Sequence, residues 1–119
     1  FDPDLLLANF YTAQGKMGLH RDDSERRETL DAGSPVVSIS IGAAADFVFA
    51  DKRPGEASGL PGAQDDGLTR IRLGSGDVLL FGGAARLVYH GVERIVEGRT
   101  PTPGLSLKAG RLNLTFRMH

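Results

Sequence analysis

The chain has 119 residues, the usual length of one domain, and 40% hydrophobic and 24% charged residues are ordinary for a globular protein. A net charge of −1 argues against holding nucleic acid by bulk positive charge, and the absence of cysteine excludes disulfides, thiolate metal sites and cysteine nucleophiles. No apolar run approaches the ~20 residues that cross a bilayer, and the start lacks the features of a secretory signal, so we expect a cytoplasmic protein.

Short apolar or alternating runs, separated by glycine and proline, predict strands along the whole chain. The predicted strands are 5–11, 19–23, 36–42, 46–50, 68–73, 78–81, 84–95 (one strand, or two around Gly91) and 111–118. The predicted turns are 15–18 and 74–77, the loops are 51–67 and 100–104, and a helical turn is expected near 28–30. Eight or so strands in a chain of this length predict an all-β sandwich or jelly roll.

A histidine and an aspartate stand two residues apart in the stretch LHRDD. If this stretch is extended, His20 and Asp22 point to the same side, about 7 Å apart at the backbone, and could converge on one metal ion. Alone, such a pair more often lies in a solvated loop.

A second histidine, His90, follows a tyrosine in the apolar stretch YHG. Alone, it reads as a core or rim histidine bonded to the backbone. Two histidines and one carboxylate together match the facial triad of non-haem iron(II) sites, although zinc takes the same ligands. The third histidine, His119, is the last residue and is expected to be frayed or exposed.

The stretch RLNLTFR, 111–117, alternates between polar and apolar residues. This pattern is typical of a half-exposed strand with its polar face in water. A jelly roll with a polar interior cavity would reverse that orientation. Arg111 and Arg117 lie roughly 20 Å apart along a straight strand. With curvature, both could still hold one small dicarboxylate, because arginine binds carboxylates bidentately.

Seven segments in chain order carry a resemblance to a known family. They are NFY (9–11), LHRD (19–22), PVVSISIG (35–42), FVF (47–49), GDVLLFGG (76–83), RLVYHGV (86–92) and RLNLTFR (111–117). With these segments the chain resembles the catalytic core of the AlkB family of iron(II)- and 2-oxoglutarate-dependent dioxygenases. The resemblance implies a double-stranded β-helix, which is a jelly roll.

The resemblance also assigns the candidate residues. It implies that His20, Asp22 and His90 bind Fe(II). Arg111 and Arg117 would hold 2-oxoglutarate, with further polar contacts from Asn9, Tyr11 and Asn113. Arg53, in a basic loop, would contact substrate, although a solvated surface charge is an equal alternative. An acidic residue that contacts the base in bacterial members aligns with Ser24.

The implied activity is oxidative demethylation of N-alkylated bases in DNA, a direct-reversal repair of DNA damage that uses O2 and releases formaldehyde and succinate. The substrate would be single-stranded or flipped-base alkylated DNA. Residues 1–119 would form the catalytic core of a monomeric enzyme, without the family's N-terminal nucleotide-recognition lid.

Two alternatives stay open at this point. One is a 2-oxoglutarate dioxygenase that acts on RNA or protein, which the near-neutral charge allows. The other is a non-enzymatic or zinc-binding jelly-roll module. The two arginines of RLNLTFR favour an enzyme, because a module that only binds metal has no use for a dicarboxylate site.

Overall fold

The structure is a computed structural model that describes residues 1–53, 56, 59–97, 104, 107 and 109–119. Its strands are β1 (Leu5–Tyr11), β2 (Met17–His20), β3 (Val36–Gly42), β4 (Ala44–Ala50), β5 (Thr69–Leu73), β6 (Val78–Phe81), β7 (Tyr89–Val96) and β8 (Arg111–Arg117). The short helices are α1 (Arg27–Asp31) and the 3-10 turn η1 (Gly83–Ala85).

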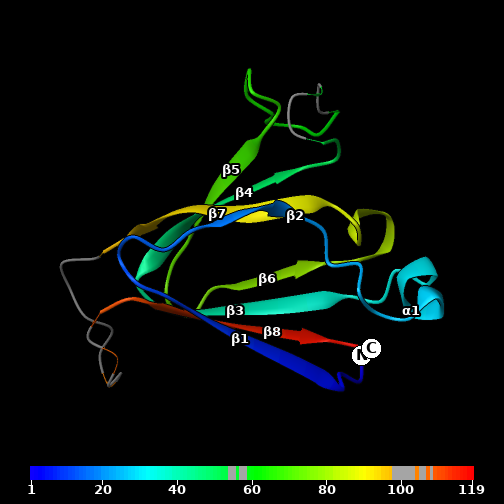
Figure 1. Cartoon of the computed structure of the whole chain (residues 1–119), viewed down its shortest axis with the longest axis horizontal. Coiled ribbons are helices and arrows are strands. Elements are labelled where there is room, and N and C mark those ends of the chain that lie inside the picture. The colour runs from blue at the N-terminus through cyan, green and yellow to red at the C-terminus, as the bar shows by residue number, and fades with distance from the viewer. Residues whose placement is uncertain (54–55, 57–58, 98–103, 105–106, 108) are drawn as a thin grey trace.

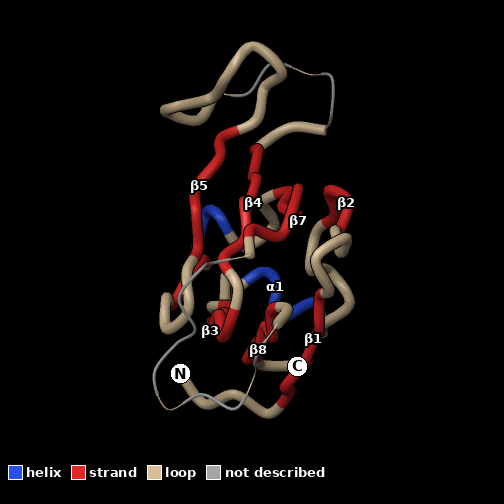
Figure 2. The backbone as a smooth tube through the Cα atoms, turned by 90° about the vertical axis from the view of Figure 1, so that its left-hand side faces the viewer, coloured by secondary structure: helices blue, strands red, loops and turns tan. Residues whose placement is uncertain are grey.

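The strands form two antiparallel four-stranded sheets, in the orders β1-β8-β3-β6 and β2-β7-β4-β5. The sheets lie as two layers, with α1 at one end (Figure 1). Figure 2 shows the same layers from the side, with β4 and β5 leading away from the body of the molecule. The all-β fold predicted from the sequence is confirmed.

Most predicted strands are confirmed, and three boundaries are corrected. The predicted strand over 84–95 begins only at Tyr89, because the preceding segment closes into η1 through a bond from the Ala85 amide to the Gly82 carbonyl of 3.0 Å. The turn predicted over 15–18 lies earlier, where the Gly15 amide donates to the Thr12 carbonyl. β2 ends at His20, so the predicted extension to 23 is wrong. The described part of the loop predicted over 51–67 is irregular. Most of the loop predicted over 100–104 lies outside the described residues.

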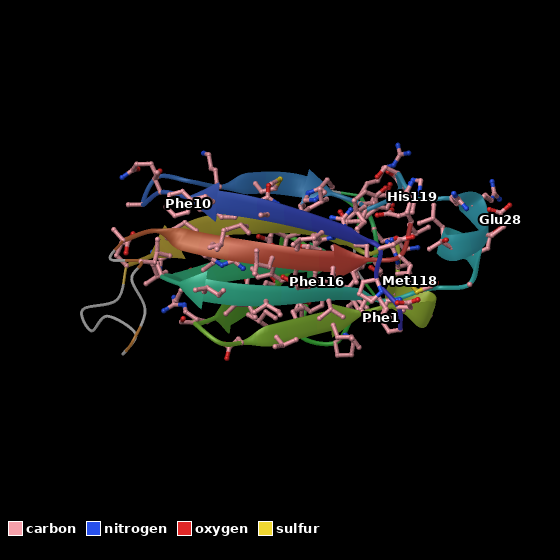
Figure 3. The ribbon with its side chains drawn as sticks, turned by 90° about the horizontal axis from the view of Figure 1, so that it is seen from below. Phe1, Phe10, Glu28, Phe116, Met118 and His119 are labelled. Atoms are coloured by element: carbon pink, nitrogen blue, oxygen red, sulfur yellow. The ribbon has the colours of Figure 1, made fainter. Side chains whose placement is uncertain are left out.

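The first sheet turns its polar face inward. Along β8 burial alternates strictly, with the polar residues buried and the leucines and phenylalanine only partly covered. Figure 3 views the opposite face, where Phe10 and Phe116 lie on the outside of the sheet, and Phe10 is 56% exposed. The half-exposed strand with its polar face in water, which the alternation alone indicates, is therefore wrong, and β8 has the reversed orientation that a jelly roll with a polar interior allows.

The second sheet supplies the apolar half of the interior. Its buried residues pack with one aromatic ring of β1 in a small core. That core consists of Tyr11, Ala45, Phe47, Leu73, Val92 and Ile95. Three of these core residues, Tyr11, Phe47 and Val92, also line a cavity together with the polar face of β8. Among the described residues, no helix is long and apolar enough to span a membrane.

An ion-pair cluster ties three strands together on the outer side of the second sheet. Asp46 on β4 accepts from Arg72 Nε and Arg94 Nε, each at 2.7 Å, and these residues are its register partners on β5 and β7. The Arg72 hydrogen bond, helped by the bond and charge of Arg94, lowers the pKa of Asp46 below its ordinary value of 3.8.

We expect Asp46→Asn to lower the free energy of unfolding by about 0.5–1 kcal/mol near neutral pH, as is typical of exposed ion pairs. A carboxyl with a lowered folded-state pKa stabilises the fold above its unfolded-state pKa, here near 3.8, and loses that effect as the pH falls through the folded-state value. Urea unfolding of both proteins from pH 7 downward checks this. A difference that stays constant into strong acid would contradict it.

Candidate metal centre and its pocket

Three side chains converge where β2 and β7 meet. One possible ligand atom from each of His20, Asp22 and His90 lies within 4.8 Å of the other two. Asp22 stands between the imidazoles, with Oδ1 3.6 Å from His20 Nε2 and Oδ2 3.5 Å from His90 Nε2. The structure thus brings together the three residues that the sequence singled out, although Asp22 lies just beyond the strand.

Backbone carbonyls orient both imidazoles. His20 Nδ1 lies 2.9 Å from the Gly18 carbonyl oxygen, and His90 Nδ1 lies 3.1 Å from the Val88 carbonyl oxygen. A carbonyl oxygen only accepts, so each Nδ1 donates a proton to its carbonyl, and Nε2 is the nitrogen of each ring that faces Asp22. In metal-binding histidines, a hydrogen bond of this kind from the nitrogen that does not bind the metal fixes the tautomer of the ring.

A glycine allows the two histidines to be neighbours. His20 and His90 are register partners, and their ring centroids lie 4.5 Å apart. A Cβ on Gly91 would come within 2.6 Å of the Met17 carbonyl oxygen, closer than such atoms approach. Because any larger residue would push β2 away from β7, the glycine of the YHG stretch sets the spacing of the site.

Charge around Asp22 keeps it ionised. Burial alone would raise its pKa. The hydrogen bond and charge of His90, together with the charges of Arg117 and His20, outweigh burial and leave the pKa of Asp22 below its ordinary value. Arg117 Nη2 lies 3.0 Å from Asp22 Oδ2. An anionic carboxylate between two imidazole Nε2 atoms is a donor set suited to a divalent cation.

Arg111 lies at the other end of β8 and is 1% exposed. Its guanidinium carbon sits 5.4 Å from the centroid of the Tyr11 ring, and its Nη2 donates to Ser40 Oγ at 2.8 Å. Its Nε and Nη1 are buried without a hydrogen-bond partner, and no carboxylate among the described residues pairs with it. Burial lowers the pKa of Arg111. A buried guanidinium with no carboxylate beside it would be compensated by an anion that binds in the pocket.

Backbone conformation places Arg111 at that end. Gly110 has a φ of +83°, which favours glycine, and a Cβ there would lie 2.7 Å from the Tyr11 carbonyl oxygen. The chain thus turns tightly into β8, beside the end of β1. Arg111 and Tyr11 become register partners across the two strands.

Smaller polar groups line the wall between the two arginines. Asn113 Nδ2 donates to Ser38 Oγ at 2.6 Å, and Thr115 Oγ1 donates to Asn113 Oδ1 at 2.9 Å. Asn9 on β1 is the register partner of Asn113. Every residue predicted to contact 2-oxoglutarate therefore lines one pocket, together with the three predicted metal ligands.

The pocket is a small polar cavity of about 50 Å³ between the sheets. A second, mostly apolar hollow of about 600 Å³ adjoins it. The two share Phe47, Leu79 and Phe81 as walls. The metal ligands line the polar cavity, which shares these walls with the larger apolar hollow.

Other predicted residues lie apart from these hollows. Arg53 is exposed in the loop after β4 and lines neither cavity, so its role stays a prediction. Ser24 is exposed as well. The His119 side chain is exposed as expected, but its backbone is not frayed. Its amide donates to Asp4 Oδ1 at 2.7 Å, and its carbonyl accepts from Thr29 Oγ1 at 2.7 Å.

Two charged residues beside the site are not distinguished by the sequence pattern. Glu25 and Arg86 are both buried, and both belong to the network around Asp22 and Arg117. Glu25 sits in a run of exposed charges, and Arg86 follows a glycine-rich turn, so neither shows a periodic signal. The one available clue is that Arg86 opens the RLVYHGV segment.

Two facing antiparallel sheets that enclose two histidines and a carboxylate at one end, and a buried arginine at the other, define a jelly-roll protein of the non-haem metal type. The sequence profile of the 2OG-Fe(II) oxygenase superfamily matches residues 1–117. The chain belongs to this superfamily, whose name states its use of 2-oxoglutarate and iron(II).

Individual relatives agree with this membership. The chain is 43% identical over 120 residues to the DNA N(6)-methyladenine demethylase ALKBH1C of Arabidopsis thaliana, covering 98% of the chain and 24% of that protein. It is 37% identical over 117 residues to the alpha-ketoglutarate-dependent dioxygenase AlkB of Escherichia coli, covering 98% and 46% respectively. The solved structure of OsALKBH1 superposes with a TM-score of 0.84 at 44% identity, over 100% of the chain and 49% of that structure.

The likeness to OsALKBH1 confirms the predicted jelly roll. The matches to relatives named AlkB and ALKBH1 confirm the resemblance read from the sequence. The chain spans between a quarter and a half of the length of these curated relatives.

Proposed function

We propose that residues 1–119 form the catalytic core of a 2-oxoglutarate-dependent dioxygenase that removes methyl groups from N-alkylated bases in DNA. The observation that carries the proposal is one pocket holding a two-histidine, one-carboxylate donor set and, at its far end, the buried Arg111, whose Nε and Nη1 have no hydrogen-bond partner. Membership of the superfamily and relatives named as DNA demethylases support the same conclusion.

The side chains fit the metal and co-substrate. His20, Asp22 and His90 supply three ligands, which leaves positions free on a metal of higher coordination number. Arg111, whose Nε and Nη1 have no partner, would take the distal carboxylate of 2-oxoglutarate beside Tyr11. Arg117, beside Asp22 and with its Nε free, would take the carboxylate nearer the metal.

When bound, the iron would couple oxidation of 2-oxoglutarate by O2 to hydroxylation of the N-methyl group, which then leaves as formaldehyde. The chain's own residues would position the reactants. Arg111, Arg117 and Asn113 would hold the co-substrate along β8. The carbonyls of Gly18 and Val88 would keep the proton of each imidazole on Nδ1, so that Nε2 can bind the metal. The apolar core behind Phe47 excludes water from one side of the pocket.

The larger hollow would receive the target base. It shares walls with the cavity that holds the metal ligands and is lined by Phe47, Phe49 and Phe81, whose apolar and aromatic faces suit a base taken out of its stack. Arg21 lines it as well. Arg21 lies 5.1 Å over the Tyr89 ring and could meet a phosphate or the base edge.

The test is mass spectrometry of single-stranded DNA oligonucleotides that carry one 1-methyladenine or one N6-methyladenine. Each is incubated with the protein, iron(II), ascorbate and oxygen, with and without 2-oxoglutarate. We expect loss of one methyl group only when 2-oxoglutarate is present, with equal amounts of succinate and formaldehyde. Asp22→Ala serves as the inactive control.

The same assay separates the alternatives. Demethylation of matched RNA or of a methyl-lysine peptide, but not of DNA, would replace the proposed substrate. Binding of zinc without any 2-oxoglutarate binding would favour the metal-binding module. If the protein neither binds 2-oxoglutarate nor turns it over, that result contradicts the assignment as a dioxygenase.

A further inference from the structure

The buried Arg86 contacts three groups, and it is neither a predicted metal ligand nor a predicted contact of 2-oxoglutarate. It is 2% exposed and follows η1 directly. Its Nε donates to the Ser34 carbonyl at 2.8 Å, and its Nη1 donates to the backbone carbonyl of Asp22 at 2.6 Å. Its Nη2 lies 3.2 Å from Glu25 Oε2, a charge contact that is not aligned as a hydrogen bond.

Glu25 links this arginine to the pocket. Its side chain is fully buried, and its other oxygen, Oε1, accepts from Arg117 Nη1 at 3.0 Å. Arg117 in turn reaches Asp22 Oδ2 at 3.0 Å through Nη2. The four residues form a closed circuit, because Arg86 holds the backbone of Asp22 while Arg117 holds its carboxylate.

The circuit balances its charges. It contains two arginines and two carboxylates, all buried. Removing one arginine therefore leaves a buried carboxylate that has lost one of the two positive charges beside it. Without Arg86, Glu25 would be neutralised by Arg117 alone. A co-substrate carboxylate arriving at Arg117 would then compete with Glu25 for the same guanidinium.

We propose that Arg86 is a positioning residue that keeps Arg117 available to the co-substrate by sharing the charge of Glu25, and fixes the metal ligand Asp22 through its backbone carbonyl. The proposal rests on the proposed function, since it concerns the same metal and 2-oxoglutarate. Arg86 would act through Glu25 and Asp22, and would touch neither ligand itself.

The experiment measures binding by calorimetry, with Mn(II) in place of iron so that no turnover occurs. For Arg86→Met we expect 2-oxoglutarate to bind to the Mn(II)-loaded protein about 10-fold or more weakly, as for the loss of a charge-assisted contact. Affinity for Mn(II) alone should fall about 10-fold as well, as for groups that orient metal ligands. Arg94→Met, which removes an ion-paired arginine of the outer surface, should change neither affinity.

A double variant separates positioning from general damage. In Glu25→Gln/Arg86→Met the competing carboxylate is also gone, so affinity for 2-oxoglutarate should recover most of its loss. Affinity for Mn(II) should stay low, because the bond to the Asp22 carbonyl is still missing. If Arg86→Met only destabilised the fold in general, adding Glu25→Gln would not restore affinity for 2-oxoglutarate while leaving affinity for Mn(II) low.

The outcomes are distinct. Wild-type affinities in folded Arg86→Met would overturn the inference, and so would a double variant that binds 2-oxoglutarate no better than the single one. If Arg86→Met does not fold, Arg86→Lys decides the matter, since a lysine cannot keep all three contacts and should still weaken both ligands. A wild-type protein that binds no 2-oxoglutarate in the presence of Mn(II) would instead overturn the proposed function.

Discussion

Replacing Arg111 with methionine is expected to weaken co-substrate binding strongly while making the ligand-free protein more stable. 2-Oxoglutarate should bind about 100-fold or more weakly, because two charge-assisted bonds to its distal carboxylate are lost. The free energy of unfolding should rise by about 1–3 kcal/mol, the gain seen when apolar residues replace buried charges.

The two effects have one cause. Arg111 is almost fully buried, lies over the Tyr11 ring and has two nitrogens without partners, so the ligand-free fold carries the cost of a desolvated cation. Methionine fills similar space without the charge. The anion that compensates Arg111 in function would come with the co-substrate.

Thermal and urea unfolding measure the stability, and calorimetry with Mn(II) measures the binding. Arg111→Lys is the matched control, because it keeps a buried charge and should recover part of the affinity but none of the stability. A methionine variant that is clearly less stable than wild type would contradict the view that Arg111 is uncompensated.

Asp22→Ala is expected to lower affinity for divalent metal by more than about 100-fold. This loss exceeds the one expected when a residue that only hydrogen-bonds to a metal ligand is changed. The fold should persist with a loss of about 1–3 kcal/mol, because Arg117 keeps its pairing with Glu25. Titration with Mn(II) and circular dichroism measure the two effects.

The neighbouring residue supplies the control for this variant. Asp23 carries the same side chain one position along, but it is exposed and is not part of the three-residue cluster. Asp23→Ala should therefore bind Mn(II) like the wild type. If Asp22→Ala did so too, the ligand assignment would be wrong.

The sequence predicted this architecture well where local pattern and global fold agree. Alternation in VVSISIG and RLNLTFR located β3 and β8 within a residue, and the spacing of His20 and Asp22 indicated a shared side. The inward orientation of Arg111 and Arg117 could not follow from alternation alone, which is identical for a strand with its polar face in water. It became an expectation only with the family resemblance.

Glu25 and Arg86 show what a linear pattern leaves out. They lie 61 positions apart, and each is buried only because loops after β2 and η1 fold over the same point. Burial of this kind depends on tertiary contacts. No periodicity in either local segment records it.

The position of β8 also has a consequence for how the chain folds. β8 lies between β1 and β3, and β1 pairs with no other strand among the described residues, so the β1 edge of this layer is held by contacts that span nearly the whole sequence. Non-local pairing of this kind is slow to form. During synthesis β1 and the edge of β3 that faces β8 stay unpaired until β8 has been made, although β3 can already pair with β6. The two arginines then enter the interior in the same step that joins the layer, so the chain has no folded intermediate with this sheet complete and the pocket missing.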